Sequence, residues 1–269
     1  MLLDLYTQLT TPCSPHLRNL GYLSETLDMR RRAGRNSAAW QPHLDATRSF
    51  VLSSAERCRS KGTVIILGSG LLLDLPLVEL SSMFREVLLK DVICLPETRK
   101  ELRKHPNVTF LEHDVTGLAA DLYRNGLQGV GNLPEPMQTR PQDERDADLV
   151  VSLNILSQLW VIPRAYASRL RDIGPEQVDE WCGRITEAHY ASLRALTSPI
   201  CLIADHQFIK RDRNGTVIST GSTVGNLALP EPDASWTWNI APLSKESPDL
   251  SKELTVGGWH FPPHSLTSL

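Results

Sequence analysis

The chain has 269 residues, of which 41% are hydrophobic and 22% are charged, and this composition excludes a wholly disordered protein. The 28 lysine and arginine residues nearly balance the 31 aspartate and glutamate residues. The resulting net charge of -3 excludes a strongly basic nucleic-acid coat and a strongly acidic tail. The length predicts one large domain, or one domain with an appendage.

The cysteines and the apolar stretches indicate the compartment. The five cysteines are scattered, without a C-x-x-C pair, which argues against a disulfide framework or a structural zinc site and favours reduced thiols. Residues 1–11 lack the basic head of a signal peptide, and the longest apolar stretch, at 64–73, is too short to span a bilayer. We therefore expect a soluble, cytoplasmic protein without a membrane segment.

The first 60 residues read as helical, with one helix opening near Ser24 and a second starting at Asn36 or Ser37. Pro42 lies in the first turns of that second helix, which blurs its start. From Lys61 onward, short apolar runs alternate with helical stretches. The sequence thus predicts an N-terminal helical cap segment over 1–60 and an α/β domain over 61–269.

From residue 61 onward, expected strands and helices alternate, which is typical of a mostly parallel sheet flanked by helices. The expected strands are 63–67, 87–89, 108–111, 148–153 and 200–204, and the expected helices are 71–84, 96–104, 117–125 and 175–196. The pattern predicts a Rossmann-like sheet. A proline-rich stretch at 131–146 reads as a surface loop, and two interpretations stay open for it: an insertion without a role, or a lid over the site.

The last third of the chain is β-rich. The tetrapeptide at 212–215, Asp-Arg-Asn-Gly, is typical of a hairpin turn between strands at 207–210 and 216–220. Two more strands are expected at 236–240 and 254–261. These strands predict an antiparallel C-terminal end to the sheet.

The turn after the first strand is the most informative segment. Leu67 leads into Gly68-Ser69-Gly70, and glycine at such a turn lets the backbone approach a ligand closely. On its own this pattern is weak, because many α/β proteins use a glycine here only to turn tightly.

Polar residues at the ends of the next strands strengthen the interpretation. Asp91 ends the second strand, where a carboxylate can accept hydrogen bonds from both hydroxyls of a ribose. Asp114 ends the third strand, where a carboxylate can accept from the exocyclic amine of adenine. The fourth strand ends in Ser152-Leu153-Asn154. Either aspartate alone is equally well explained as a helix cap, but the ordered set favours a nucleoside ligand.

This ordered set resembles the class I S-adenosylmethionine-dependent methyltransferases over residues 61–205. Gly68 and Gly70 match the glycine motif of the family, whereas Ile66 stands where the family has an acidic residue and Leu72 where it has a third glycine. The resemblance implies S-adenosylmethionine as cofactor, and Asp74 is a candidate to replace the missing acidic residue. The implied cofactor-binding residues are Leu67, Gly68, Ser69, Gly70, Asp91, Val92, Asp114, Val115, Ser152, Leu153 and Asn154.

Candidate catalytic residues follow the fourth and fifth strands. Asn154, Asp205 and His206 are expected near the methyl-transfer site, and His206 has the pKa range of a base. The alternative is that Asp205 and His206 only order the loop into the C-terminal part. No H-x-x-x-H or H-E-x-x-H spacing occurs, so no metal centre is expected.

The acceptor is expected to be a small molecule, and the low aromatic content and balanced charge argue against nucleic acid. Candidate acceptor-pocket residues from the N-terminal segment are Tyr22, Arg35, Trp40 and His43, with Trp160 and Tyr190 as further candidates. The arginines at 30, 31, 32 and 35 read as a solvated helix face.

Two other functions stay open. Ile66 and Leu72 suit a methyltransferase-like partner subunit without catalysis. A nicotinamide-dependent oxidoreductase is disfavoured because Leu73 takes the third glycine position of its fingerprint. The sequence does not indicate an oligomeric state.

Overall fold

A computed structural model describes residues 2–129, 131–136, 147–244 and 248–263. The strands are β1 (Thr63–Leu67), β2 (Glu86–Asp91), β3 (Val108–Glu112), β4 (Leu149–Leu153), β5 (Ile200–Asp212), β6 (Val217–Ser222), β7 (Ala234–Ala241) and β8 (Leu250–Phe261). The helices are α1 (Leu2–Thr10), α2 (Pro15–Leu20), α3 (Tyr22–Arg35), α4 (Ser37–Arg57), α5 (Leu77–Met83), α6 (Pro96–Leu102), α7 (Ala119–Leu127), α8 (Val161–Ala167) and α9 (Pro175–Arg194).

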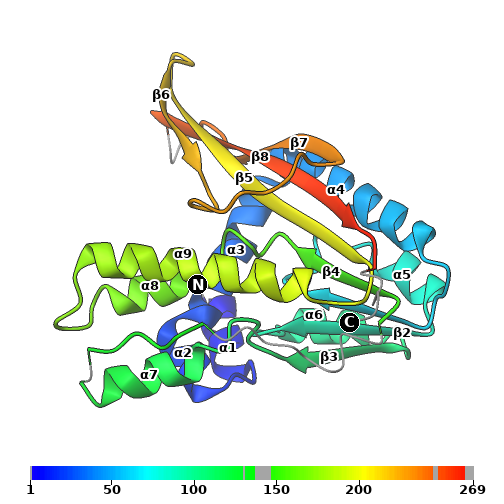
Figure 1. The fold of residues 1–269 in the computed structure, drawn as a ribbon, viewed down its shortest axis with the longest axis horizontal. Coiled ribbons are helices and arrows are strands. Elements are labelled where there is room, and N and C mark those ends of the chain that lie inside the picture. The colour runs from blue at the N-terminus through cyan, green and yellow to red at the C-terminus, as the bar shows by residue number, and fades with distance from the viewer. Residues whose placement is uncertain (1, 130, 137–146, 245–247, 264–269) are drawn as a thin grey trace, which may run out of the picture.

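All eight strands form one sheet, in the order β3-β2-β1-β4-β5-β8-β7, with β6 paired to β5 (Figure 1). The first five strands in this order are parallel, whereas β8 and β7 are antiparallel to their neighbours. The predicted fold, a mostly parallel Rossmann-like sheet with an antiparallel C-terminal end, is confirmed.

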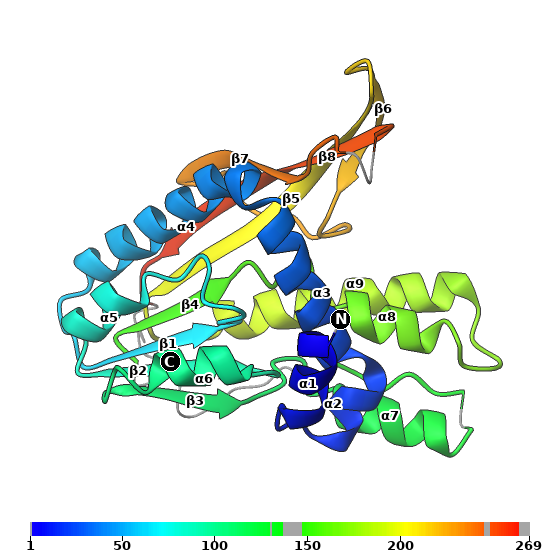
Figure 2. The same cartoon turned by 180° about the vertical axis from the view of Figure 1, so that it is seen from behind.

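The central strands are apolar on both faces because helices cover both. Val64 and Ile66 of β1 pack with Phe50 and Val51 of α4 in one cluster. Ile65 and Leu67 face the other way, into a cluster with Leu193 at the end of α9. Figure 2 shows α4 running along the antiparallel end of the sheet, in contact with β7 and β8.

The carboxyl edge of the sheet is covered by α2, α3, α7 and α8. Leu17 of α2, Leu122 of α7, Ala167 of α8 and Trp181 of α9 share a separate apolar cluster. This cluster fixes the N-terminal helices over the ends of the parallel strands (Figure 2). The division into a 1–60 segment and a 61–269 domain stays a prediction.

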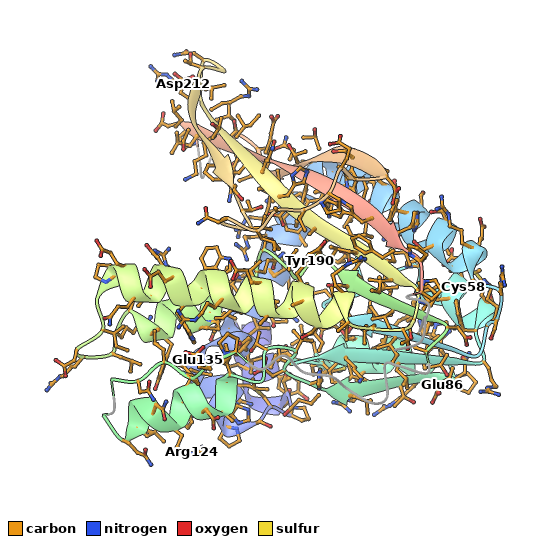
Figure 3. The ribbon with its side chains drawn as sticks, viewed as in Figure 1. Cys58, Glu86, Arg124, Glu135, Tyr190 and Asp212 are labelled. Carbon is orange, nitrogen blue, oxygen red and sulfur yellow. The ribbon has the colours of Figure 1, made fainter. Side chains whose placement is uncertain are left out.

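One predicted helix and two predicted strands are wrong in extent. The helix expected over 71–84 is formed only over Leu77–Met83, because Leu72 adopts a left-handed conformation (φ 62°) and Pro76 directly precedes the helix. The strands expected at 200–204 and 207–210 are one strand, β5, whose far half pairs with β6 and β8. Figure 3 labels Asp212, the last residue of β5, at the far end of the strand.

The proline-rich stretch lies partly outside the described residues. Residues 131–136 are described, and the Pro134 carbonyl accepts a hydrogen bond from the Trp181 indole at 2.7 Å. Helix α8 was not expected from the sequence, since Pro163 interrupts its pattern.

Candidate functional site

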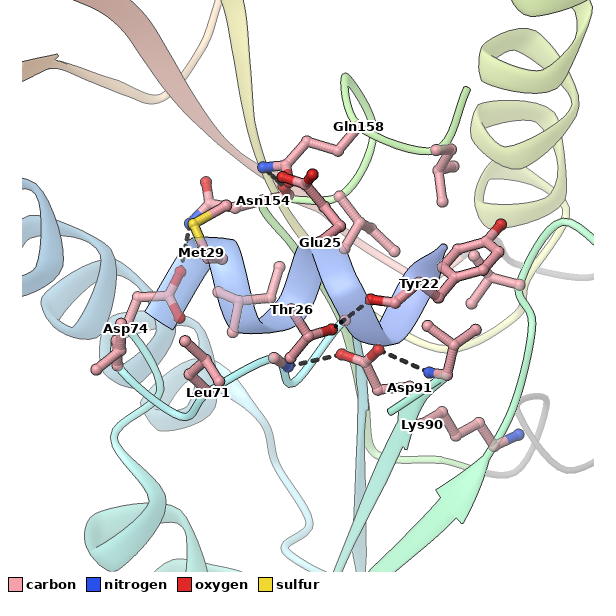
Figure 4. Close-up of a pocket in the computed structure, with 18 of the residues that line it drawn as sticks. Tyr22, Glu25, Thr26, Met29, Leu71, Asp74, Lys90, Asp91, Asn154 and Gln158 are labelled. Carbon is pink, nitrogen blue, oxygen red and sulfur yellow. Dashed lines mark hydrogen bonds between the residues drawn. The ribbon is translucent and has the colours of Figure 1, made fainter. Parts of the chain in front are cut away.

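A cavity opens at the carboxyl edge of the sheet, between α3, α4 and the loops that follow β1, β2, β3 and β4. Figure 4 shows α3 crossing this cavity, with Tyr22, Glu25, Thr26 and Met29 among its lining residues. The strand order places β3 and β2 at one end of the cavity and β7 at the opposite end. The two ends differ in chemistry and are described separately.

The turn after β1 contains three left-handed residues. Gly68 (φ 85°) has no room for a side chain, because a Cβ there would collide with Cγ2 of Ile155. Gly70 (φ 51°) is different, since a Cβ there would meet nothing within 4 Å. Leu72 (φ 62°) keeps the left-handed turn without glycine, at a cost of about 1–2 kcal/mol. The loop therefore makes a left-handed turn at position 72 although the residue there is not glycine.

Asp91, at the end of β2, is held at the cavity wall by backbone amides (Figure 4). Its Oδ2 accepts a hydrogen bond from the Gly70 N–H and its Oδ1 accepts one from the Val92 N–H, each at 2.6 Å. Burial raises the pKa of this carboxyl, while the backbone hydrogen bonds lower it. The carboxylate is thus fixed in orientation, and each oxygen retains capacity to accept from a ligand.

Asp114, after β3, also lines the cavity, but its carboxylate is engaged locally. Oδ1 accepts from the Thr116 N–H at 2.9 Å and from the Thr116 hydroxyl at 2.6 Å, and Oδ2 accepts from the Ala119 N–H at 2.9 Å. Ala119 is the first residue of α7, so Asp114 satisfies one of the free backbone N–H groups at the start of that helix. Its role toward adenine stays a prediction. We call the part of the cavity around Asp91 and Asp114 the carboxylate end.

Asp74 and Asn154 form a pair midway along the cavity. The Asn154 amide donates from Nδ2 to Oδ2 of Asp74 at 2.6 Å, as Figure 4 shows. Asn154 has a left-handed backbone (φ 52°), and its Oδ1 is buried without a hydrogen-bond partner among the described residues. Burial raises the pKa of Asp74, while the Asn154 hydrogen bond lowers it. The pair presents two oxygen acceptors in one place.

The opposite part of the cavity, which we call the aromatic end, is formed by Met29, Trp40, His43, Leu44, Leu73 and Trp238. The His43 ring stacks on Trp238, with ring centroids 4.1 Å apart, and Trp40 meets Trp238 edge-on at 5.1 Å. Behind them, the Trp236 indole donates a hydrogen bond to Nδ1 of His43 at 3.0 Å. Burial lowers the pKa of His43 to about 3, so this imidazole is neutral at pH 7.

The sequence-predicted cofactor residues are only partly brought together. Gly68, Gly70, Asp91, Val92, Asp114, Val115, Leu153 and Asn154 line the cavity. Leu67 packs in the core instead, and the Ser152 hydroxyl hydrogen-bonds with Nε2 of His189 at 3.0 Å. The Ser69 hydroxyl is buried without a partner among the described residues.

Of the three candidate catalytic residues, only Asn154 lines this cavity. Asp205 is buried, and its carboxylate accepts from the Ser157 hydroxyl at 2.6 Å, which ties β5 to the loop after β4. His206 lines a different hollow, with Phe208, Pro230 and Trp259. The role of His206 as a base stays a prediction without a place in the cavity.

The acceptor-pocket candidates separate in the same way. Tyr22, Trp40 and His43 line the cavity, whereas Arg35, Trp160 and Tyr190 do not. Burial raises the pKa of Tyr22, and the nearby Asp114 and Asp91 carboxylates add to that rise. Tyr190 lies on α9 (Figure 3) and contacts Phe261.

The arginine cluster of α3 is paired with acidic side chains. Arg30 pairs with Glu97, Arg31 with Asp28 and Arg32 with Glu25. These pairs fit the expected solvated helix face.

Sequence reasoning missed the contribution of the C-terminal strands to the cavity. Trp236 and Trp238 lie two residues apart on β7, so they share one face of the strand. Both rings contact His43 of α4. Only their β-strand spacing signalled them, and that spacing gives no partner.

Among the helices of the described residues, none combines the length and the apolar composition that a membrane span requires. The same residues contain no group of three or more histidine, cysteine, aspartate or glutamate side chains placed to hold a metal ion.

Comparison with known proteins gives no family model that matches this chain and no matching curated protein. Several solved structures are similar. The complex of DhpI with SAH has 15% identity and a TM-score of 0.40, covering 90% of this chain and 97% of that one. The 1,6-didemethyltoxoflavin-N1-methyltransferase of Burkholderia thailandensis has 12% identity and a TM-score of 0.43, covering 92% and 91%. The 23S rRNA methyltransferase ErmE has 13% identity and a TM-score of 0.29, covering 80% and 69%. These likenesses are too low to assign a ligand to this chain.

Proposed function

We propose that this chain binds S-adenosylmethionine in the cavity and transfers its methyl group to a small molecule. The observation that carries the proposal is the Asp91 carboxylate, fixed by the Gly70 and Val92 amides at the end of β2. A carboxylate at that position of an open α/β sheet is suited to the two hydroxyls of a ribose.

The other polar groups follow in an order that suits the rest of the cofactor. Asp114 lies on one side of Asp91, after β3, where its Oδ2 accepts one hydrogen bond from within the described residues and retains capacity for an amine. Asp74 and Asn154 lie on the other side, where β1 and β4 end. An adenine, a ribose and an amino-acid tail follow one another in the same order.

Two features of the cavity fit a bound ligand of this kind. The space beside Gly70 is open, so the backbone there is accessible to a ligand. The buried Oδ1 of Asn154 lacks a partner, and such a group costs about 1–3 kcal/mol unless a donor reaches it. An ammonium group is a donor with three hydrogens and a positive charge, and it would satisfy Asn154 and neutralise Asp74 together. Asp74 thereby replaces the acidic residue absent at Ile66.

The residues of the chain mainly hold and align the reactants. Bound S-adenosylmethionine supplies an activated methyl group, so alignment and exclusion of water are required more than a base. Trp40 and Trp238 are almost fully buried and keep water from the aromatic end. The hydrogen bond to Asp74 fixes the Asn154 side chain at the point where the carboxylate end and the aromatic end of the cavity meet.

A non-catalytic methyltransferase-like partner subunit is the second candidate function, and Ile66 and Leu72 motivate it. The left-handed turn at Leu72 and the Asp74–Asn154 pair support cofactor binding, which either candidate function allows. Formation of S-adenosylhomocysteine from S-adenosylmethionine in the presence of a mixture of small molecules separates the two candidates.

The binding proposal is tested by calorimetric titration of S-adenosylhomocysteine, with NAD as a parallel titration. We expect S-adenosylhomocysteine to bind at one site per chain and NAD not to bind. Binding of NAD alone would favour an oxidoreductase, and binding of neither ligand would contradict the proposal.

A further inference from the structure

The aromatic end of the cavity adjoins the Asp74–Asn154 pair. Leu73 and Asp74 are consecutive in the chain, and both line the cavity. If the proposed function holds, a ligand tail bound by Asp74 places the transferable methyl group beside this end. The aromatic end is therefore the place where an acceptor would bind, and its chemistry indicates what kind of molecule it takes.

The tautomer of His43 is set by its neighbour. An indole N–H can only donate, so Nδ1 of His43 must be the acceptor of the Trp236 hydrogen bond. A neutral imidazole with an accepting Nδ1 carries its proton on Nε2. Nε2 has no hydrogen-bond partner among the described residues. His43 consequently offers a neutral N–H donor.

A second donor lies in the same group of rings. The Trp238 indole N–H is buried and has no partner among the described residues. Trp238 stacks on His43, so the two unsatisfied donors belong to rings in direct contact. The buried indole N–H of Trp238 is stabilised when an acceptor atom reaches it.

The charges around the cavity disfavour a charged acceptor. Within the described part of the chain, no lysine or arginine lines the aromatic end itself. Arg48 lies outside the lining and donates to the Leu73 carbonyl, so an anionic group in the aromatic end would have no cation in direct contact. Figure 4 shows Lys90 on the Asp91 side, away from Met29 and Asp74. A positively charged acceptor would find no unpaired carboxylate there, because Glu25 pairs with Arg32 and, in the proposed function, Asp74 is taken by the ammonium group of the cofactor.

The lining of the aromatic end favours a ring. Indole, imidazole and thioether groups make favourable contacts with aromatic rings, at the edge or the face. We propose that the aromatic end takes an uncharged aromatic or heteroaromatic acceptor that presents a hydrogen-bond-accepting atom to the Nε2–H of His43, with Trp236 as the positioning residue that holds His43 in this tautomer. This proposal names the substrate class of the proposed methyltransferase and rests on that function.

The tautomer is tested first, by nitrogen NMR of the full chain labelled in histidine. At neutral pH we expect His43 to give the pair of shifts of a neutral ring protonated at Nε2. Trp236→Phe keeps an aromatic ring but removes the donor, and we expect a mixture of tautomers in that variant. A ring protonated at Nδ1, or one unchanged by Trp236→Phe, would overturn the role given to the two residues.

Ligand preference is tested with three bicyclic aromatic probes that differ in charge: uncharged quinolone, anionic naphthoate and cationic naphthylmethylammonium. Binding is followed by ligand-observed NMR, with and without saturating S-adenosylhomocysteine. We expect quinolone to bind best. Its affinity should fall about tenfold in His43→Phe, which removes the donor, and by less than about threefold in His43→Gln, which retains a side-chain N–H.

The outcomes separate this proposal from the proposed function. Stronger binding of either charged probe, binding of none, or equal quinolone affinity in His43→Phe would overturn the ring pocket. Quinolone binding that depends on His43 without any S-adenosylhomocysteine binding would support the pocket and contradict the methyltransferase. Thermal unfolding of both His43 variants identifies any loss of fold.

Discussion

The two ends of the cavity are built in different ways. At the carboxylate end, Asp91 and Asp114 are held by backbone amides of the loops that follow β1, β2 and β3. At the aromatic end, Trp236 reaches His43 across 193 residues of sequence, and the Trp40 indole donates to the Ile240 carbonyl across 200. The first end is formed by local turns, whereas the second exists only once α4 has packed against β7.

The ends differ in energetics as well. At the carboxylate end, burial raises the pKa of Asp91, so its ionised form is disfavoured in the folded protein. The aromatic end buries neutral rings, which stabilises the fold. We therefore expect mutations at the carboxylate end to affect mainly ligand binding and mutations at the aromatic end to affect stability as well.

The largest expected effect is on stability at the aromatic end. Trp40 is 2% exposed and contacts Trp238, so Trp40→Ala removes a large buried ring. We expect the free energy of unfolding to fall by about 3–5 kcal/mol in denaturant titrations. The control is Trp160→Ala, at a partly exposed ring beside Arg164, with a smaller loss. Equal losses in the two variants would show that the buried ring of Trp40 stabilises the fold no more than a partly exposed ring does.

Asp91→Ala is expected to have the largest effect on ligand binding. Loss of hydrogen bonds to a charged group costs about 1.5–3 kcal/mol, so S-adenosylhomocysteine should bind roughly 10–150-fold more weakly by calorimetry. Asp121→Ala is the control, because that carboxylate is exposed and pairs only with Arg124 within the described residues. Unchanged affinity in folded Asp91→Ala would argue against a ribose at this position.

Asp74→Asn should affect stability in the opposite direction to Trp40→Ala. A carboxyl whose pKa is raised on folding destabilises the fold as pH rises through that pKa, because its ionised form is buried. Without ligand, the variant should be more stable than the wild type by about 1 kcal/mol at pH 7, measured by denaturant unfolding. The difference should shrink toward acid pH, below about 4, where the unfolded carboxyl is also protonated. A less stable variant at pH 7 would contradict the account of Asp74.

The smallest effect is expected for His206→Ala. His206 lines a hollow apart from the cavity, so S-adenosylhomocysteine affinity should be unchanged within about twofold. Turnover measured across pH, once an acceptor is known, tests its predicted role as a base. Weaker S-adenosylhomocysteine binding in the variant would show that a change in this hollow alters the ligand-binding cavity.

The contrast between the ends also explains what could be predicted from sequence. Local sequence patterns predict the carboxylate end. These patterns are the β-branched run of β1, the glycine turn that follows it, and the aspartates where β2 and β3 end. The helix expected from residue 71 was wrong because a leucine at position 72 gives no local signal of a left-handed turn. The sequence could not predict that His43 offers a donor at Nε2, because the hydrogen bond that fixes its tautomer comes from Trp236, which is distant in the sequence.

The same reasoning applies to Asp205 and His206. Both follow the first half of β5, and the sequence suggested a strand end there. In the folded protein β5 continues to Asp212, because β6 and β8 pair with its far half. Asp205 therefore lies within a strand rather than at its carboxyl end, where ligands bind in such sheets.

The central claim is that one cavity holds a nucleoside at the carboxylate end and an amino-acid tail at Asp74. Calorimetry of wild type and Asp74→Asn with S-adenosylhomocysteine and with methylthioadenosine, which lacks the amino-acid tail, tests it most directly. The expected result is that Asp74→Asn weakens S-adenosylhomocysteine about tenfold and leaves methylthioadenosine unchanged. Equal weakening of both ligands, or no binding of either to the wild type, would contradict the claim.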